Sequence, residues 1–201
     1  YSRHQPLHPD EYREAIDTFS SFAPGKVQQI KREKFFMAGD NLWLQSPCVE
    51  NDDENCVAVS GHFYNWQEVT PGAKSLANGI KEGYVNGGTG FLKKLTGSFA
   101  IAAYNEATHS LKLVNDCSGF YPLFYYLDKD VCIFCTAIEP VTSYKKFDDT
   151  WDFTALAQYT KAVSVFDDRT LFKHIKNLNP GSEVTISSEA KSEHRYDWLS
   201  V

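Results

Sequence analysis

The amino-acid sequence predicts an α+β domain in which helices cover an antiparallel β-sheet. Four β-prone segments follow one another between residues 97 and 135, separated by short turns. Helical patterns lie outside that run, at residues 8–20, 75–95 and 153–161. With 201 residues, 42% of them hydrophobic and 23% charged, the chain has the length and composition of one globular domain with a sizeable core. We therefore expect residues 1–201 to form a single domain.

The chain begins with a predicted amphipathic helix over residues 8–20, which places three apolar residues on one face: Tyr12, Ile16 and Phe19. Two short strands are then predicted at Lys34–Ala38 and Asn41–Ser46, joined by a turn at Gly39-Asp40. An acidic loop is expected over Val49–Asn55.

The run Cys56–Val59 predicts a buried strand that ends in a sharp turn at Ser60-Gly61. Helices are predicted at Ser75–Val85 and Gly90–Leu95, with a break at Asn86-Gly87-Gly88 between them. The four segments from Gly97 onward predict one antiparallel sheet.

The C-terminal part combines a helix and a hairpin. Asp152 is suited to cap a helix over Phe153–Lys161. The segments NPGSEVTIS and SEHRYDW then predict a last β-hairpin.

Charge and composition argue against several classes of partner. The net charge is −6, from 20 Lys and Arg against 26 Asp and Glu, and the basic residues are scattered, so no nucleic-acid partner is expected. No apolar run approaches the roughly 18 residues that a membrane span requires. The five cysteines are thinly spread and no signal-like stretch opens the chain, which predicts reduced thiols and a cytoplasmic location.

The sequence predicts no metal or cofactor site in this domain. Cys132-Ile-Phe-Cys135 has no second cysteine pair or histidine pair to complete a zinc site. The six histidines never occur at metal-ligand spacing, and no glycine-rich phosphate-binding loop is present.

Two local sequences are more specific. One is VAVSGHFYN (57–65), a strand followed by small residues, an aromatic residue and an amide. The other is LVNDCSGFYPLF (113–124), a strand, a tight turn at Ser118-Gly119 and a proline that starts the next strand. In this order and spacing they resemble the class II glutamine amidotransferase domain found at the N-terminus of asparagine synthetases and β-lactam synthetases.

Further segments carry the same resemblance. Residues 91–105, FLKKLTGSFAIAAYN, match the family pattern Phe-Leu-x-x-Leu-x-Gly-x-Phe-Ala-Phe-Ala-x-Tyr-Asp. Residues 115–124 match Arg-Asp-x-x-Gly-x-x-Pro-Leu-Tyr, and Pro-x-Gly and Arg-x-Tyr-Trp-like stretches follow at 178–182 and 194–198. The likeness implies the N-terminal-nucleophile hydrolase fold, a four-layer αββα sandwich of two antiparallel sheets.

The resemblance also implies a chemistry. In the family, an N-terminal cysteine attacks the glutamine amide while its own α-amine moves the proton. An Asn-Gly pair forms the oxyanion hole, and an arginine and an aspartate hold the substrate's carboxylate and ammonium groups.

The functional positions of this chain depart from that pattern. The chain begins with Tyr1, so no catalytic cysteine is present in it. Ser60, Gly61 and His62 stand at the oxyanion and substrate pocket, with Ser60 in place of the asparagine and His62 in place of an acidic residue. The expected arginine is missing from Asn41–Ser46, and Pro71–Ser75 brings a lysine where the aspartate is expected. We therefore expect Ser60, Gly61 and His62 to be a vestigial pocket.

The resulting expectation is a degenerate, structural amidotransferase-like domain of an ATP-dependent amide-forming ligase. Its partner would be a C-terminal synthetase domain of the same protein, which would hold ATP and Mg²⁺, and a homodimer is left open. Two alternatives remain: an active glutaminase whose cysteine precedes Tyr1, and a freestanding ligand-binding module that uses the altered pocket.

Overall fold

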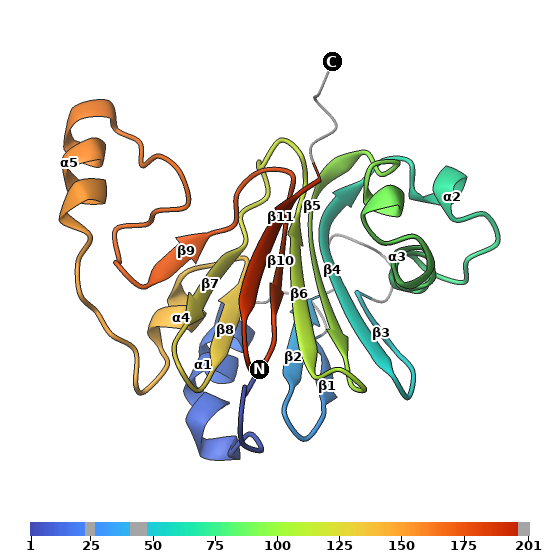
Figure 1. The fold of residues 1–201 in the computed structure, drawn as a ribbon, viewed down its shortest axis with the longest axis horizontal. Coiled ribbons are helices and arrows are strands. Elements are labelled where there is room, and N and C mark those ends of the chain that lie inside the picture. The colour runs from blue at the N-terminus through green and yellow to red at the C-terminus, as the bar shows by residue number, and fades with distance from the viewer. Residues whose placement is uncertain (23–26, 41–47, 197–201) are drawn as a thin grey trace.

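The computed structural model describes residues 1–22, 27–40 and 48–196 (Figure 1). Its helices are α1 (Pro9–Phe22), α2 (Trp66–Val69), α3 (Leu76–Leu92), α4 (Glu139–Thr142) and α5 (Phe153–Ala162). Its strands are β1 (Val27–Lys31), β2 (Phe36–Asp40), β3 (Val49–Asn51), β4 (Asn55–Phe63), β5 (Gly97–Asn105), β6 (Ser110–Asn115), β7 (Phe124–Leu127), β8 (Cys132–Cys135), β9 (Ile175–Asn177), β10 (Ser182–Ile186) and β11 (Lys191–Arg195).

The described strands form antiparallel sheets. The largest has six strands in the order β11-β10-β6-β5-β4-β3, and a second has three in the order β8-β7-β9. The hairpin β1–β2 forms a separate pair. At the centre of the large sheet, Ile101 of β5 lies opposite Val59 of β4 and Val114 of β6.

Successive side chains of a strand point to opposite faces of a sheet, and β5 buries both of its faces. Ala100, Ala102 and Tyr104 enter the core between the two sheets, whereas Phe99 and Ile101 enter the core beneath α3. A third core joins the small sheet to α4, and α1 packs against α4. The layers are therefore helix, sheet, sheet, helix, which confirms the predicted αββα sandwich (Figure 1).

Several predicted elements are confirmed. The first helix is α1. The helices predicted at Ser75–Val85 and Gly90–Leu95 are the two parts of α3, which is capped by Ser75 through a hydrogen bond that its side chain accepts from the Asn78 amide. The predicted break is a kink at Gly88, whose φ is 51°. The capped helix after Asp152 is α5, and the last hairpin is β10–β11.

The predicted turn at Gly39-Asp40 is wrong. Both residues belong to β2, where Gly39 pairs with Gln28 of β1 and Asp40, the last residue of the strand, pairs with Val27. Gly39 is required there by packing, because a Cβ at this position would lie 2.8 Å from Cys48 Sγ. The predicted strand Asn41–Ser46 lies outside the described residues.

The expected acidic loop and the sharp turn at Ser60-Gly61 are also corrected. Val49–Asn51 and the start of β4 form a hairpin, and β4 continues through Ser60 and Gly61 to Phe63. Gly61 has a φ of 98°, and a Cβ there would lie 2.3 Å from the Ser98 carbonyl oxygen. The glycine therefore allows β4 to approach β5 closely. In the sequence, glycine is typical both of turns and of such close contacts, so the pattern alone predicts a turn here.

The four segments predicted to form one sheet are divided between two. β5 and β6 pair in the large sheet, whereas β7 and β8 pair in the small one. The change of sheet occurs in residues 116–123, between Asn115 and Phe124. The sequence therefore predicts the four strands correctly, but it does not show that they belong to two different sheets.

Candidate functional site

A pocket of about 380 Å³ lies between the layers. One wall is the inner face of β4 and β5, which contributes Ser60, Ala100 and Ala102. The opposite walls come from β2, β8 and the apolar face of α1, including Ile16 and Phe19. Its size lies in the range of small-molecule sites.

Ser60 is the serine that the sequence places at the oxyanion position, and the structure brings it to this pocket. Its hydroxyl shares a 2.7 Å hydrogen bond with the hydroxyl of Tyr121, which also lines the pocket. The Tyr121 ring lies against the backbone of Gly61, because a Cβ on Gly61 would lie 3.1 Å from its Cδ2. Tyr121 therefore covers the Ser60-Gly61 pair from the pocket side.

Asp116 fixes the turn that presents Tyr121. The residue is fully buried, and its carboxylate accepts hydrogen bonds from the amides of Ser118 and Gly119 at 2.8 and 2.9 Å. The Phe99 amide donates to the same carboxylate at 3.1 Å, which ties the turn to β5. Hydrogen bonds to a buried carboxylate are stronger than neutral ones, so this turn has little freedom to move.

The other predicted site residues do not join Ser60 in the pocket. His62 is exposed and does not line it. Lys74 is also exposed and precedes the Ser75 cap of α3, on the other side of the large sheet. The assignment of Ser60, Gly61 and His62 as a vestigial site stays a prediction.

The pocket offers little charge to a polar substrate. Among its described lining residues, Asp40 carries the only charged side chain. The segment 41–47, where the sequence lacks the expected arginine, lies outside the described residues.

Two cysteines line the pocket, and neither is an activated nucleophile. Burial raises the pKa of the Cys132 thiol to about 12, and it also raises the pKa of Cys135. A thiol with a raised pKa is protonated at neutral pH, whereas attack requires the thiolate.

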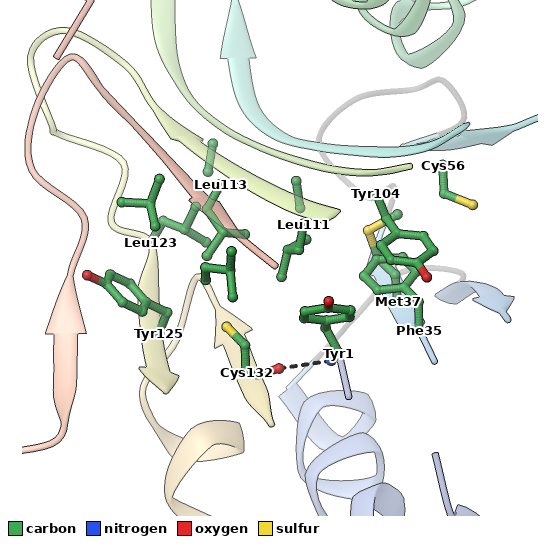
Figure 2. Packing of buried hydrophobic residues seen from close by; sticks show 14 of the residues in the cluster. Tyr1, Phe35, Met37, Cys56, Tyr104, Leu111, Leu113, Leu123, Tyr125 and Cys132 are labelled. Atoms are coloured by element: carbon green, nitrogen blue, oxygen red, sulfur yellow. Dashed lines mark hydrogen bonds between the residues drawn. The ribbon is translucent and has the colours of Figure 1, made fainter. Parts of the chain in front are cut away.

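Tyr1 lines this pocket. Its ring belongs to the core between the two sheets (Figure 2). Its ammonium group donates to the Cys132 carbonyl oxygen at 2.8 Å, and the Cys132 amide donates to the Tyr1 carbonyl oxygen at 2.8 Å. Burial lowers the pKa of this ammonium group. Ser2 continues the antiparallel pairing by a bridge to Val131.

The described residues contain neither a cluster of metal ligands nor a membrane-spanning helix. None of their groups of three His, Cys, Asp or Glu side chains is placed to hold a metal ion. None of their helices is both long and apolar enough to cross a membrane.

Comparison with known proteins identifies the family. A family model described as a glutamine amidotransferase domain matches residues 42–197. The chain belongs to this family. Asparagine synthetase [glutamine-hydrolyzing] 2 of Bacillus subtilis (strain 168) is 27% identical over 196 residues, which cover 89% of this chain and 24% of that protein. Asparagine synthetase [glutamine-hydrolyzing] 1 of the same organism is 33% identical over 93 residues, covering 46% and 15%.

One solved structure is similar to this chain in fold. The allosteric regulatory enzyme of purine biosynthesis has a TM-score of 0.50 at 14% identity, covering 79% of this chain and 32% of that one. The glutamine phosphoribosylpyrophosphate amidotransferase of B. subtilis has a TM-score of 0.49 at 13% identity, covering 74% and 30%. This chain thus spans about a quarter of the length of the first curated relative and less of the second.

Tyr121 is the residue of this site that sequence reasoning did not single out. It directly precedes Pro122 in the segment that carries the family resemblance, at a position where the family pattern is variable. Only the fold shows that this position lies across from Ser60.

Proposed function

We propose that this amidotransferase domain is part of an asparagine synthetase-family ATP-dependent ligase, and that it supports the ligase structurally without releasing ammonia from glutamine. ATP and Mg²⁺ would be bound by a synthetase domain that follows in the longer protein. The length of the B. subtilis relatives, about four times this chain for the first, supports such a partner.

The hydrogen bond between Ser60 and Tyr121 carries the proposal. An oxyanion hole needs a free donor directed at the oxygen that becomes negative in the transition state. Here the Ser60 hydroxyl is shorter than a carboxamide, and it shares a hydrogen bond with the Tyr121 hydroxyl in which either group can donate. Loss of one such donor lowers the rate by about 100-fold or more.

The pocket chemistry supports the same conclusion. Glutamine carries a carboxylate and an ammonium group, which need charged or strongly polar partners once they leave water. The described lining supplies one carboxylate side chain, Asp40, and is otherwise mostly apolar. The thiols of Cys132 and Cys135 have raised pKa values and do not replace a catalytic cysteine.

The test uses the complete gene product. We expect ATP-dependent amide formation with ammonia or an amine, and no glutamate release when glutamine is the nitrogen source. Glutamate release that keeps pace with ATP consumption would overturn the proposal. A Tyr121→Phe variant is a useful companion, because it removes the hydroxyl that is hydrogen-bonded to Ser60 while keeping the ring.

A second candidate, an active glutaminase, is favoured by the surroundings of Tyr1. Tyr1 and Cys132 exchange both backbone hydrogen bonds, as paired residues of an antiparallel ladder do. Any residues before Tyr1 in a longer protein would continue along β8 toward Ile133 and Cys135, which line the pocket.

Labelling separates the two candidates. A glutamine analogue with an electrophilic carbon at the amide position should leave the complete protein unlabelled if the domain is structural. Covalent attachment to a cysteine before Tyr1, located by mass spectrometry, would establish the second candidate instead.

A further inference from the structure

Two connecting segments lie against each other beyond the end of β6. One is the turn of residues 116–121, which presents Tyr121 to the pocket, and the other is the connection 178–181 between β9 and β10. A Cβ on Gly119 would lie 2.6 Å from Pro180 Cγ, so the two segments are in direct contact. Residues 178–181 do not line the pocket themselves.

Backbone hydrogen bonds tie the two segments together at Asp116. Its carbonyl oxygen accepts from the Gly181 amide at 2.8 Å and from the Gly119 amide at 3.2 Å. The side chain of Asn115, which is fully buried, donates to the Leu178 carbonyl oxygen at 2.9 Å. The connection 178–181 therefore cannot move far without displacing the turn of residues 116–121.

Tyr196, which directly follows β11, is bonded to both parts of this assembly. Its hydroxyl donates to the Asn115 carbonyl oxygen, and its amide donates to the Gly181 carbonyl oxygen at 2.8 Å. Tyr196 is 2% exposed and belongs to the core beneath α3. Burial raises the pKa of its hydroxyl, so the group stays a protonated donor at neutral pH.

The contacts continue from there to the pocket. Asn115 is followed by Asp116, whose carboxylate accepts hydrogen bonds from the Ser118 and Gly119 amides and, at 3.4 Å, from the Tyr121 amide. The Tyr121 hydroxyl then meets the Ser60 hydroxyl at 2.7 Å. Tyr196 thus stands at one end of a continuous series of hydrogen-bonded groups that ends at Ser60.

We propose that Tyr196 is a positioning residue of the pocket: it fixes the turn of residues 116–121 and thereby holds the Tyr121 hydroxyl against Ser60. Its own side chain does not line the pocket, so it acts only through that turn. The proposal concerns the position of Tyr121 and is independent of the proposed loss of glutaminase activity. Glutamate release would overturn the proposed function and leave this inference intact.

A series of contacts shows proximity and not coupling, so the experiment must separate the positioning of Tyr121 from general stability. Hydrogen exchange of the complete gene product, read by mass spectrometry, does so with two variants. Tyr196→Phe should quicken exchange of the amides in residues 116–121 about fivefold, because one buried hydrogen bond is lost.

Tyr84→Phe is the matched control for this measurement. Tyr84 is 5% exposed, lies in the same core, and donates its hydroxyl to Glu183 of β10. The variant removes the same atom from an equally buried ring, so it should quicken exchange in residues 116–121 by less than about twofold. Equal acceleration by both variants would overturn the proposal.

A second readout follows the Tyr121 side chain itself. Nitration by tetranitromethane, located by mass spectrometry, requires a phenol that is free to react. Tyr196→Phe should raise the rate of Tyr121 nitration about fivefold, and Ser60→Ala should raise it at least as much, because it removes the hydroxyl partner directly. If Tyr121 nitration does not rise in Tyr196→Phe, whatever Ser60→Ala does, the proposal is wrong.

Gly119→Ala reaches the same turn without altering Tyr196 and keeps the test decisive if Tyr196→Phe does not fold. The new Cβ would press on Pro180, so Tyr121 nitration should rise. Gly72→Ala is its control: Gly72 has a φ of 83° against 64° for Gly119, but a Cβ there meets no atom within 4 Å. Equal nitration of Tyr121 in the two alanine variants would contradict the role of the paired segments.

Discussion

Strand β5 and helix α5 are both rich in apolar residues, yet they use them in opposite ways. β5 lies between two strands and buries both faces, so that Ile101 is fully buried and even Ala100 and Ala102 are almost so. α5 leaves an apolar stripe that includes Phe153 and Tyr159 in solvent. Apolar content alone thus does not distinguish a buried element from an exposed one. The difference lies in how many neighbouring elements the fold packs against each.

Truncating a side chain to alanine should therefore destabilise the protein far more in β5 than on the exposed face of α5. Ile101→Ala should lower the free energy of unfolding by about 4 kcal/mol, because it removes buried contacts and leaves a cavity between β5 and α3. Urea denaturation followed by circular dichroism measures the loss. Ile101→Val is the matched control, with an expected loss of about 1 kcal/mol. A loss below 1 kcal/mol for the alanine variant would show that the sheet is not packed on both faces.

The next prediction concerns Asp116, a buried carboxylate in the turn that presents Tyr121. Asp116→Ala should destabilise the chain by about 3 kcal/mol, because it leaves the amides of Phe99, Ser118 and Gly119 without their acceptor. Asp116→Asn keeps one acceptor oxygen and should cost less. If both variants unfold at the wild-type urea concentration, the turn that presents Tyr121 is not held by this carboxylate.

Loss of Asp152, the N-cap of α5, should destabilise the chain less than loss of Asp116. Asp152→Ala removes the cap of α5 and should weaken the helix by about 1 kcal/mol. Hydrogen exchange of the α5 amides should quicken about fivefold, while exchange in β5 stays unchanged. If exchange quickens equally in α5 and β5, the two elements unfold together as one unit.

Lowering the pH should weaken the same α5 cap, because it protonates Asp152. Hydrogen bonds from the Ala155 amide, together with Arg169, lower the pKa of Asp152. A carboxylate whose pKa is lower in the folded state stabilises that state above its unfolded pKa of about 3.9, and the contribution is lost as the pH falls through the folded value. The difference between wild type and Asp152→Asn in α5 exchange should therefore shrink as the pH falls below about 4. A difference that is constant with pH would rule out the charged cap.

The smallest change in stability is expected from a substitution on the exposed apolar face of α5. Tyr159→Ala should change the free energy of unfolding of the chain by no more than about 0.5 kcal/mol, since the side chain is 47% exposed. The same urea titration used for Ile101 measures it. A loss of 2 kcal/mol would mean that the stripe packs on its own chain.

The sequence alone determined the elements with strong local signals. The Asp152 cap, the helical spacing of residues 75–92 and the β-prone runs are written within a few residues of where they act, so α3, α5 and β5 were predicted. The family motifs also identified the sandwich and placed Ser60 at the pocket. Local patterns failed at Gly39 and Gly61, because glycine marks close packing as well as turns.

Only the tertiary structure decided which strands share a sheet and what surrounds Ser60. Sheet partners depend on contacts between residues far apart in the chain, which no short window contains. Tyr121 reaches Ser60 across 61 positions. His62 shares a strand with Ser60 two positions away, yet it is exposed and does not line the pocket. The exposure of the α5 stripe has the same origin: its spacing predicts an apolar face, but the fold determines whether anything covers that face.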